Sequence, residues 1–438
     1  MAHSRYQECT KSELDLFAAP HIQTSIEKAQ WVEYFPISNI TESGPVEFNI
    51  SGSGEEYTDL RQAWLYVKVK VTKDDGGNLV DGTDKVGPSN LFLQTLFSQV
   101  DVSLNDKMIT ESTNTNPYKA LISTLLTYGS DAKRSQLTAE MFYKDTAGKM
   151  DVVDPSATSP NQGLKTRYSF IKESATVELI GPLHVDLFYQ DRLLLNGVSI
   201  RVRLNRSKNS FSLLSGIDGA SYKVTLSHAS LFVRKVKLYS DTFLAHAAAL
   251  EHAPALYPMR RIECKALSIP QGNMSFSPDD VFLGQIPKRI ILGLVENSAF
   301  NGAYNKNPFN FKHFKATQVG VLVNGESVPM KALQLNFDQK QYMTGYMSLF
   351  TGTGMLYHDQ GNEITRSDYP NGYTLYAFDL SPDLAAGPHV SSTKQGNLRL
   401  SFQFAEGLPS TVNCIIYAEF DAHIEIDANR NVTYNWSL

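Results

Sequence analysis

The sequence predicts an all-β protein made of two tandem eight-stranded jelly-roll sandwiches (a double jelly roll) with short helices in loops. Alternating apolar and polar stretches, separated by turn residues, lie on both sides of one alanine-rich segment, residues 240–253. Regularly spaced strands with such turns are typical of sandwiches and barrels. The two sides also resemble each other in local sequence, and a chain of 438 residues is long for a single hydrophobic core.

The predicted first sandwich covers residues 45–239 and follows an N-terminal arm, residues 1–44, which has weak periodicity and is expected to dock on another surface. Residues 65–71 (LYVKVKV) alternate strictly, as a half-buried strand does. Further strands are expected at 99–104, 177–180, 183–188 and 222–238, with a hairpin at 194–204 that turns at Asn196-Gly197.

Helix and loop signals interrupt the strands of the first half. Residues 117–128 (PYKALISTLLTY) place apolar side chains at helical spacing, with a proline at the start and Gly129 after the end, as helix termini prefer. Residues 72–90 and 144–165 are rich in turn residues and are expected to be surface loops.

The segment between the halves, residues 240–258, is predicted to be a helical connector. Its apolar residues recur at helical spacing and are expected to pack against a sheet. Ser240 and Asp241 can cap the first turn, and Pro254 ends the helix. The apolar stripe consists of Phe243, Leu244, Ala247 and Leu250.

The predicted second sandwich covers residues 259–427 and precedes a C-terminal tail, residues 428–438. A short helix is expected at 341–350. Strands are expected at 259–267, 289–295, 317–323, 373–378, 398–404 and 412–426.

Two local matches between the halves indicate a duplication. Residues 97–109 (FSQVDVSLNDKMI) match residues 316–328 (ATQVGVLVNGESV), and the alternating strand at 198–204 (VSIRVRL) matches that at 398–404 (LRLSFQF). The matches occur in the same order, and a helix signal follows the first match in each half. The same hairpin is therefore expected twice.

Composition excludes several classes of protein. A net charge of −5 argues against strong direct binding of nucleic acid, which needs clustered Lys and Arg. The start of the chain lacks the apolar stretch of a secretory signal, and no apolar run is long enough for a membrane span, so we expect a soluble protein made in the cytosol. Cys264 and Cys414 lie in phase with inward apolar residues and are expected to be buried and reduced, whereas Cys9 is not.

Motifs that carry enzyme chemistry are missing from the sequence. It has no phosphate-binding loop, nucleophile elbow or H-E-x-x-H metal helix. His246, Glu251 and His252 share the connector, but their spacing places the two histidines on different helix faces. We therefore expect no catalytic residue, no metal ligand and no cofactor, and a structural protein rather than an enzyme.

Two sets of charged residues offer alternative functions. A glycosidase pair could be drawn from Asp279, Asp280 and Asp359, but solvated loop carboxylates explain them better. A basic series could contact nucleic acid, but such charges more often keep sheets soluble or pair with a neighbouring subunit. This series consists of Arg201, Arg203, Arg206, Lys208, Arg234, Lys235 and Lys237.

Several segments together resemble one protein family. They include residues 194–211 (LLNGVSIRVRLNRSKNSF), 283–311 (LGQIPKRIILGLVENSAFNGAYNKNPFNF) and 408–427 (LPSTVNCIIYAEFDAHIEID), with shorter ones at 45–60 and 372–384. On these residues the chain resembles the double jelly-roll major capsid proteins of adintoviruses and Polinton (Maverick) elements.

The resemblance implies a virion protein with no catalytic residues. It implies homotrimers that look hexagonal from outside, in an icosahedral shell around double-stranded DNA. Their partners would be neighbouring capsomers and penton and minor capsid proteins, after synthesis in the host cytoplasm. The alternative from another class is a non-viral jelly-roll binding protein, such as a lectin-like or cytokine-like trimer.

Overall fold

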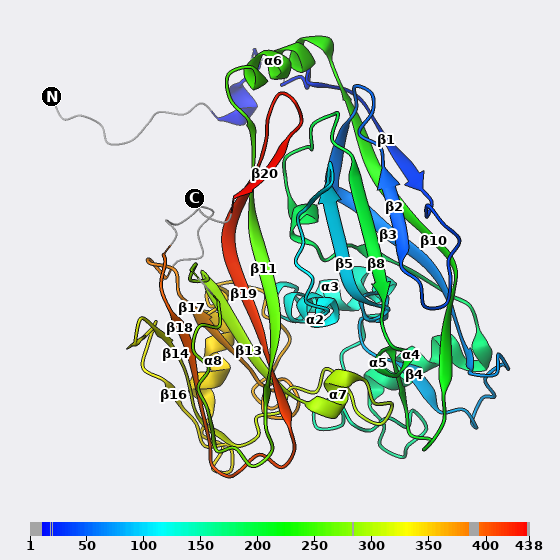
Figure 1. The fold of residues 1–438 in the computed structure, drawn as a ribbon, viewed down its shortest axis with the longest axis vertical. Coiled ribbons are helices and arrows are strands. Elements are labelled where there is room, and N and C mark those ends of the chain that lie inside the picture. Colours follow the sequence, from blue (N-terminus) through cyan, green and yellow to red (C-terminus); the bar gives the residue numbers. More distant parts are fainter. Residues whose placement is uncertain (1–10, 18, 20, 283, 385–393, 436–438) are drawn as a thin grey trace.

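The structure, a computed structural model, describes residues 11–17, 19, 21–282, 284–384 and 394–435. Figure 1 shows two sandwiches of antiparallel strands with α2 between them, which confirms the predicted fold class. The strands of the first half are β1 (Ile26–Tyr34), β2 (Val46–Ile50), β3 (Tyr57–Lys73), β4 (Val86–Pro88), β5 (Phe97–Leu104), β6 (Lys107–Met108), β7 (Val177–Pro182), β8 (Ile200–Arg206), β9 (Leu213–Ser215) and β10 (Tyr222–Leu238).

The second half repeats the strands of the two facing sheets, has no described counterpart of the β4-β9 pair, and adds β16 and β20. Its strands are β11 (Ala255–Ile269), β12 (Ser275–Phe276), β13 (Arg289–Glu296), β14 (Ala316–Val323), β15 (Glu326–Ser327), β16 (Leu333–Gln334), β17 (Leu375–Asp379), β18 (Leu398–Phe404), β19 (Val412–Ile426) and β20 (Val432–Asn435). The α-helices are α1 (Phe92–Thr95), α2 (Asn116–Thr127), α3 (Ser130–Arg134), α4 (Gln162–Ile171), α5 (Asn209–Ser212), α6 (Ser240–Leu250), α7 (Asn297–Asn301) and α8 (Met343–Thr351). The 3-10 helices are η1 (Ser12–Leu14), η2 (Gln136–Glu140), η3 (Lys172–Ser174) and η4 (Asp186–Tyr189).

Strand order is the same in the two halves. In the first half a sheet of order β1-β10-β3-β7 faces one of order β2-β8-β5-β6. In the second half β11-β19-β13-β17 faces β12-β18-β14-β15, with β20 beside β19 and β16 beside β14. Thus β1 corresponds to β11 and β10 to β19. The duplication inferred from local sequence is present in the topology.

The matched hairpins are alike in backbone detail. Asn105 and Asn324 both adopt the left-handed conformation, with φ of 42° and 53°, which Asn tolerates better than most residues. Each accepts a hydrogen bond at Oδ1 from the residue before the closing strand, Ser199 N at 2.8 Å and Asn397 N at 2.9 Å. The closing strands begin at the next residues, Ile200 and Leu398, so the predicted alignment of these strands is two residues out.

Two large hydrophobic clusters fill the sandwiches. In β3 the inward residues Leu65, Val67, Val69 and Val71 are buried as the alternation predicts. The predicted strands at 222–238, 398–404 and 412–426 coincide with β10, β18 and β19, and the helix at 117–128 lies within one residue of α2. Cys264 and Cys414 are free and buried, as expected, whereas Cys9 lies outside the described residues.

The predicted arm, residues 1–44, is corrected by the structure. Its second part is strand β1, which pairs along β10 from Ile26 opposite Leu238 to Tyr34 opposite Leu231. The first sandwich therefore begins before residue 45. The predicted tail, residues 428–438, also contains a strand, because β20 pairs with β19. Both strands were missed because they lie at sheet edges and lack a clean apolar alternation.

The connector differs from its prediction in packing. Helix α6 forms where expected, but it lies at one end of the first sandwich (Figure 1) and none of its residues is buried. Phe243 and Leu250 pack partly against the first core, and Leu244 is exposed. Tyr239 occupies the N-cap position, with no side-chain cap from Ser240 or Asp241. The next strand, β11, begins at Ala255.

Several other predictions in the first half are wrong. Residues 183–188 contain the start of η4 rather than a strand, and residues 194–204 form no hairpin, because β8 pairs with β2 and β5. The predicted loop at 72–90 includes the end of β3 and the buried strand β4. Gly197 has a positive φ, so the turn at Asn196-Gly197 was predicted correctly. The strand predicted before that turn is absent from the described elements.

Candidate functional site

The junction between the two sandwiches is the candidate site. Helix α2 belongs to the first half but packs on a sheet of the second half, β11-β19-β13-β17. It covers the face of that sheet that points away from the core of the second sandwich. This face, the second outer face, includes a row of cross-strand partners that are all buried. The row consists of Cys264, Tyr417, Ile291 and Ala377.

Hydrogen bonds link α2 and the residue before it to the second outer face. Thr115, just before the helix, donates a hydrogen bond from Oγ1 to the Cys264 carbonyl at 2.7 Å. Burial raises the pKa of the Tyr417 phenol well above its ordinary value, opposed by a hydrogen bond with Ser123 of α2. Burial also raises the pKa of the Cys264 thiol to about 12. Neither group is ionised at neutral pH, as a packing role requires.

An aromatic cluster extends the contact at the start of α2. The Tyr118 ring stacks on Phe300 of the second half with centroids 5.6 Å apart. It also meets Phe309 of the second half edge-on at 5.6 Å and Phe211 of the first half at 5.9 Å. Such pairs add roughly 0.5–1.5 kcal/mol each beyond burial. The two halves therefore share one hydrophobic core at this level.

Near α6, side chains of the second half enter the core of the first sandwich. Tyr257 of β11, Ile424 of β19 and Tyr434 of β20 belong to the core of the first sandwich. The Tyr257 hydroxyl donates to the Leu193 carbonyl at 3.2 Å and accepts from Leu195 N at 3.1 Å. Each half therefore contributes side chains to the core of the other.

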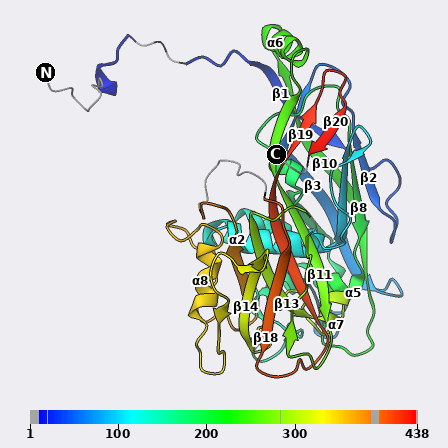
Figure 2. The same ribbon diagram turned by 60° about the vertical axis from the view of Figure 1, so that its left-hand side comes forward.

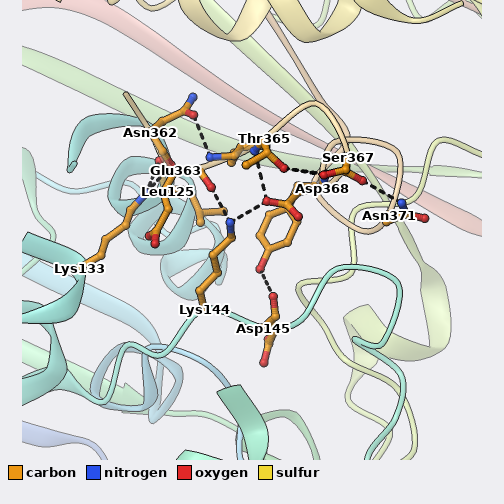
Figure 3. Close-up of polar contacts among 12 residues, drawn as sticks. Leu125, Lys133, Lys144, Asp145, Asn362, Glu363, Thr365, Ser367, Asp368 and Asn371 are labelled. Carbon is orange, nitrogen blue, oxygen red and sulfur yellow. Dashed lines mark hydrogen bonds and ion pairs between the residues drawn. The ribbon is translucent and has the colours of Figure 1, made fainter. Parts of the chain in front are cut away.

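Polar bonds between loops close the junction on the side of α3 (Figure 3). Lys133 donates to the carbonyls of Leu125 at 2.9 Å and of Asn362 at 2.7 Å. Burial lowers the pKa of Lys133 to about 7. Lys144 forms an ion pair with Asp368 at 2.8 Å and also donates to the Glu363 carbonyl. Both lysines come from the first half and bind the same loop of the second.

A buried ion pair lies beside these lysines. Arg167 of α4 pairs with Asp145 at 2.7 Å, and both side chains are almost fully buried. Asn307 of the second half donates to the other Asp145 oxygen at 3.0 Å, and the Tyr373 hydroxyl donates to the Asp145 carbonyl at 2.6 Å. Asn161 donates to Asp145 Oδ1 at 2.9 Å. The carboxylate is thus satisfied from both halves, as a buried charge requires.

Sequence reasoning missed this network because it treated residues 144–165 as a surface loop. In the structure Asp145 and Asn161 of that segment are buried. One signal was available, since Arg167 shares a helical face with Leu164 and Ile171 at spacings of three and four residues. An arginine in phase with apolar positions indicates a buried partner.

A small polar cavity also lies at the junction. It measures about 40 Å³ and is lined by Lys119, His184, Asp186, Arg261 and Glu263 among others. Lys119 and Asp186 form an ion pair at 2.8 Å across it. Such a volume suits a water molecule. Among the described residues no group of three or more His, Cys, Asp or Glu side chains is placed to hold a metal ion.

The histidines and carboxylates named as candidates in the sequence analysis do not lie together in one site. His246, Glu251 and His252 are exposed at the end of the first sandwich, and His246 Nδ1 lies 3.1 Å from the Tyr57 hydroxyl. Asp279 pairs with Arg399 at 3.3 Å. Asp280 and Asp359 are exposed in separate loops of the second half.

Most of the basic series is paired inside the chain. Arg201 and Arg203 both reach Glu47 of β2, at 2.6 Å and 3.5 Å. Arg234 pairs with Asp59 at 3.1 Å and Lys237 with Glu27 at 3.1 Å. Burial lowers the pKa of Arg206 to about 10, Lys235 donates to Thr58 Oγ1 at 2.8 Å, and Lys208 is exposed. The series therefore forms no continuous cationic surface.

No protein-family model matches the chain. An uncharacterized protein of Caenorhabditis elegans is 24% identical over 427 residues, covering 94% of this chain and 98% of that protein. Among the described residues, no helix has the length and apolar character needed to cross a membrane.

Solved structures share the fold along almost the whole chain. A chain in the cryo-EM structure of the Sputnik virophage matches with a TM-score of 0.69 and 12% identity, covering 100% of this chain and 95% of that one. The Faustovirus major capsid protein matches at 0.56 and 8%, covering 97% and 93%. The mavirus major capsid protein matches at 0.53 and 10%, covering 98% and 94%. This chain therefore has the double jelly-roll fold that these viral capsid proteins have.

Proposed function

We propose that this chain is a structural protein, the major capsid protein of an icosahedral double-stranded DNA virus or virus-like element. The observation that carries the proposal is the junction, in which two sandwiches of one topology exchange core residues and share a buried ion pair. That arrangement holds two similar blocks at one fixed orientation, as a shell subunit requires. The likeness in fold to viral major capsid proteins over almost the whole chain supports the same function.

The functional unit we propose is a homotrimer with six similar sandwiches around its axis. A ring of three needs a heterologous contact, in which one half of a subunit meets the other half of its neighbour. A duplicated chain offers two related but distinct surfaces for that contact. Neighbouring capsomers and penton and minor capsid proteins would complete the shell, and a membership in the adintovirus or Polinton (Maverick) group would follow the resemblance in sequence.

The paired basic series supports a role without strong direct binding of DNA. Arg201 and Arg203 were candidates for contacts between subunits, but their ion pairs with Glu47 give them partners within the chain. The exposed apolar residues before β1, Leu14, Leu16, Phe17 and Ile22, are better candidates, because extended apolar segments rarely stay in water.

Light scattering on a size-exclusion peak tests the proposal. We expect a mass near three chains of 48.8 kDa at micromolar concentration, and particles of hexagonal outline by electron microscopy. A stable monomer or dimer would contradict it. Neighbouring genes for a packaging ATPase, a protease and a protein-primed DNA polymerase would support the group assignment.

A further inference from the structure

One sheet of the first sandwich has an outer face that no described element covers. In β3 the residues Leu65 and Val67 point into the core, so the alternate residues Trp64 and Tyr66 point outward. Cross-strand pairing places Ile180 of β7 beside Tyr66. We call this surface the first outer face; its exposed apolar residues are Trp31, Phe35, Trp64 and Ile180, which are 51%, 60%, 36% and 40% exposed.

Contacts among the side chains confirm that they share one face. The Tyr66 ring lies 6.3 Å from Phe232 of β10 and 5.5 Å from His228, and His228 lies 6.1 Å from Phe35. Glu33 of β1 reaches the same His228 at 4.0 Å, so Trp31, two residues earlier on the strand, faces the same way. Exposed aromatic groups with a polar rim mark interaction surfaces.

The corresponding surface of the second half, the second outer face, is covered by a helix. The strands β11 and β19, which correspond to β1 and β10, are covered by α2 on the second outer face. Thr115 beside α2 bonds to Cys264, and Ser123 of α2 bonds to Tyr417. The first half has the equivalent face without an equivalent helix on it.

The counterpart of α2 is α8, which follows the matched hairpin in the second half. The buried residues of α8 are Gly345, Ser348 and Leu349, which pack within the second half. Its Met347 is 41% exposed, and Tyr357 in the following loop is 94% exposed. Figures 1 and 2 show α8 in the lower part of the molecule on the second sandwich and β1 in the upper part on the first sandwich. The two surfaces can therefore meet only between separate copies.

We propose that the first outer face of one copy binds α8 and residues 352–361 of a second copy. The inference rests on the proposed trimer and names its contact surfaces. Within one chain, α2 covers the second outer face at the row that contains Cys264 and Tyr417. Between two chains, α8 would cover the first outer face in the same way, over the rings of Trp31 and Trp64. Aromatic side chains at the centre of such a contact carry much of the binding energy.

Two single substitutions test the two sides of the contact. Trp31→Glu and Tyr357→Glu should each weaken association by at least about tenfold, corresponding to about 1.4 kcal/mol, as measured by light scattering over a concentration series. Leu244→Glu on α6, where the side chain is 63% exposed, is the matched control and should leave the trimer intact. A cooperative thermal transition in all three variants would show that they fold, since the loss of the trimer by itself can lower the melting temperature.

Mixing the two variants makes the test specific. The Trp31→Glu chain keeps its α8 loop and the Tyr357→Glu chain keeps its first outer face, so the mixture should form a heterodimer that neither variant forms alone. A mixture without heterodimer would overturn the contact. Trimers of both variants would overturn it too, while leaving the proposed function intact. A monomeric unmodified protein would instead contradict the trimer itself.

Another occupant of the face gives a different result. If Phe17→Glu disrupts the trimer and Tyr357→Glu does not, the segment before β1 rather than α8 covers the first outer face, and the proposed contact is wrong. If Tyr357→Glu weakens the trimer, the assignment to α8 is supported whether or not Phe17→Glu also weakens it, because the segment before β1 can contact a neighbouring subunit at another surface.

Discussion

The two sheets that correspond in the duplication differ in what covers them. On the second outer face the row from Cys264 through Tyr417 to Ala377 is buried, with α2 beside Cys264 and Tyr417 and α8 beside Ala377. On the first outer face the row from Glu33 through Phe232 to Trp64 stays accessible. Duplication therefore preserved the strands while the loops between them changed. The segments between the strands decide which outer face is covered within the chain and which stays accessible to a second copy.

The largest effect is expected from removing the covering half. Residues 255–438 expressed alone would expose the second outer face, since α2 is missing, together with Tyr257 and Ile424 from the first core. We expect an insoluble product or one without a cooperative thermal transition. A soluble monomer of this fragment that melts cooperatively would mean that the second sandwich does not depend on α2.

A large effect is also expected from the buried ion pair of the junction. Asp145→Asn keeps the shape of the side chain but leaves the buried Arg167 cation without its counter-charge. Breaking a buried pair in this way costs roughly 3–5 kcal/mol, which denaturant unfolding at neutral pH would measure. Glu47→Gln, which removes the partner of the exposed Arg201, is the control and should change stability little. Equal effects of the two substitutions would contradict the role given to Asp145.

The two counterpart helices should respond differently to the same kind of change. Leu125 of α2 is buried in the shared core, so Leu125→Ala should lower the free energy of unfolding by about 2–5 kcal/mol. Met347 of α8 is partly exposed, so Met347→Ala should leave the stability of an isolated subunit nearly unchanged. Chemical unfolding under conditions that dissociate the protein would compare them. Similar losses would show that α8 is as deeply packed as α2.

A pH dependence is expected from Lys133. Its pKa falls from 10.5 in the unfolded chain to about 7 in the fold, so above pH 7 the unfolded state binds more protons than the folded state. Stability should therefore rise with pH between about 7 and 10, by up to about 1.4 kcal/mol per unit, and this rise should be absent in Lys133→Met. Unfolding curves of both proteins at several pH values check the difference. Parallel pH profiles would mean that Lys133 keeps its ordinary pKa.

Strand alternation and turn residues were sufficient to predict the sandwiches. The inward residues of β3, the whole of β10, β18 and β19, and the repeated hairpin at Asn105 and Asn324 all follow from local chemistry. A strand with one buried face must alternate, and a tight turn needs a residue that accepts a positive φ. These constraints act within a few residues, so they are readable without knowing the fold.

The junction was decided by tertiary structure. Whether α2 would pack on its own sandwich or on the other one depends on contacts between residues far apart in sequence, such as Ser123 and Tyr417. The burial of Asp145 depends on Asn307 and Tyr373, and β1 becomes a strand because β10 offers it an edge. A sequence pattern records the periodicity of a segment but not its partner. The sequence therefore determined two similar blocks, and only the assembled fold determined which surface of each block was left open.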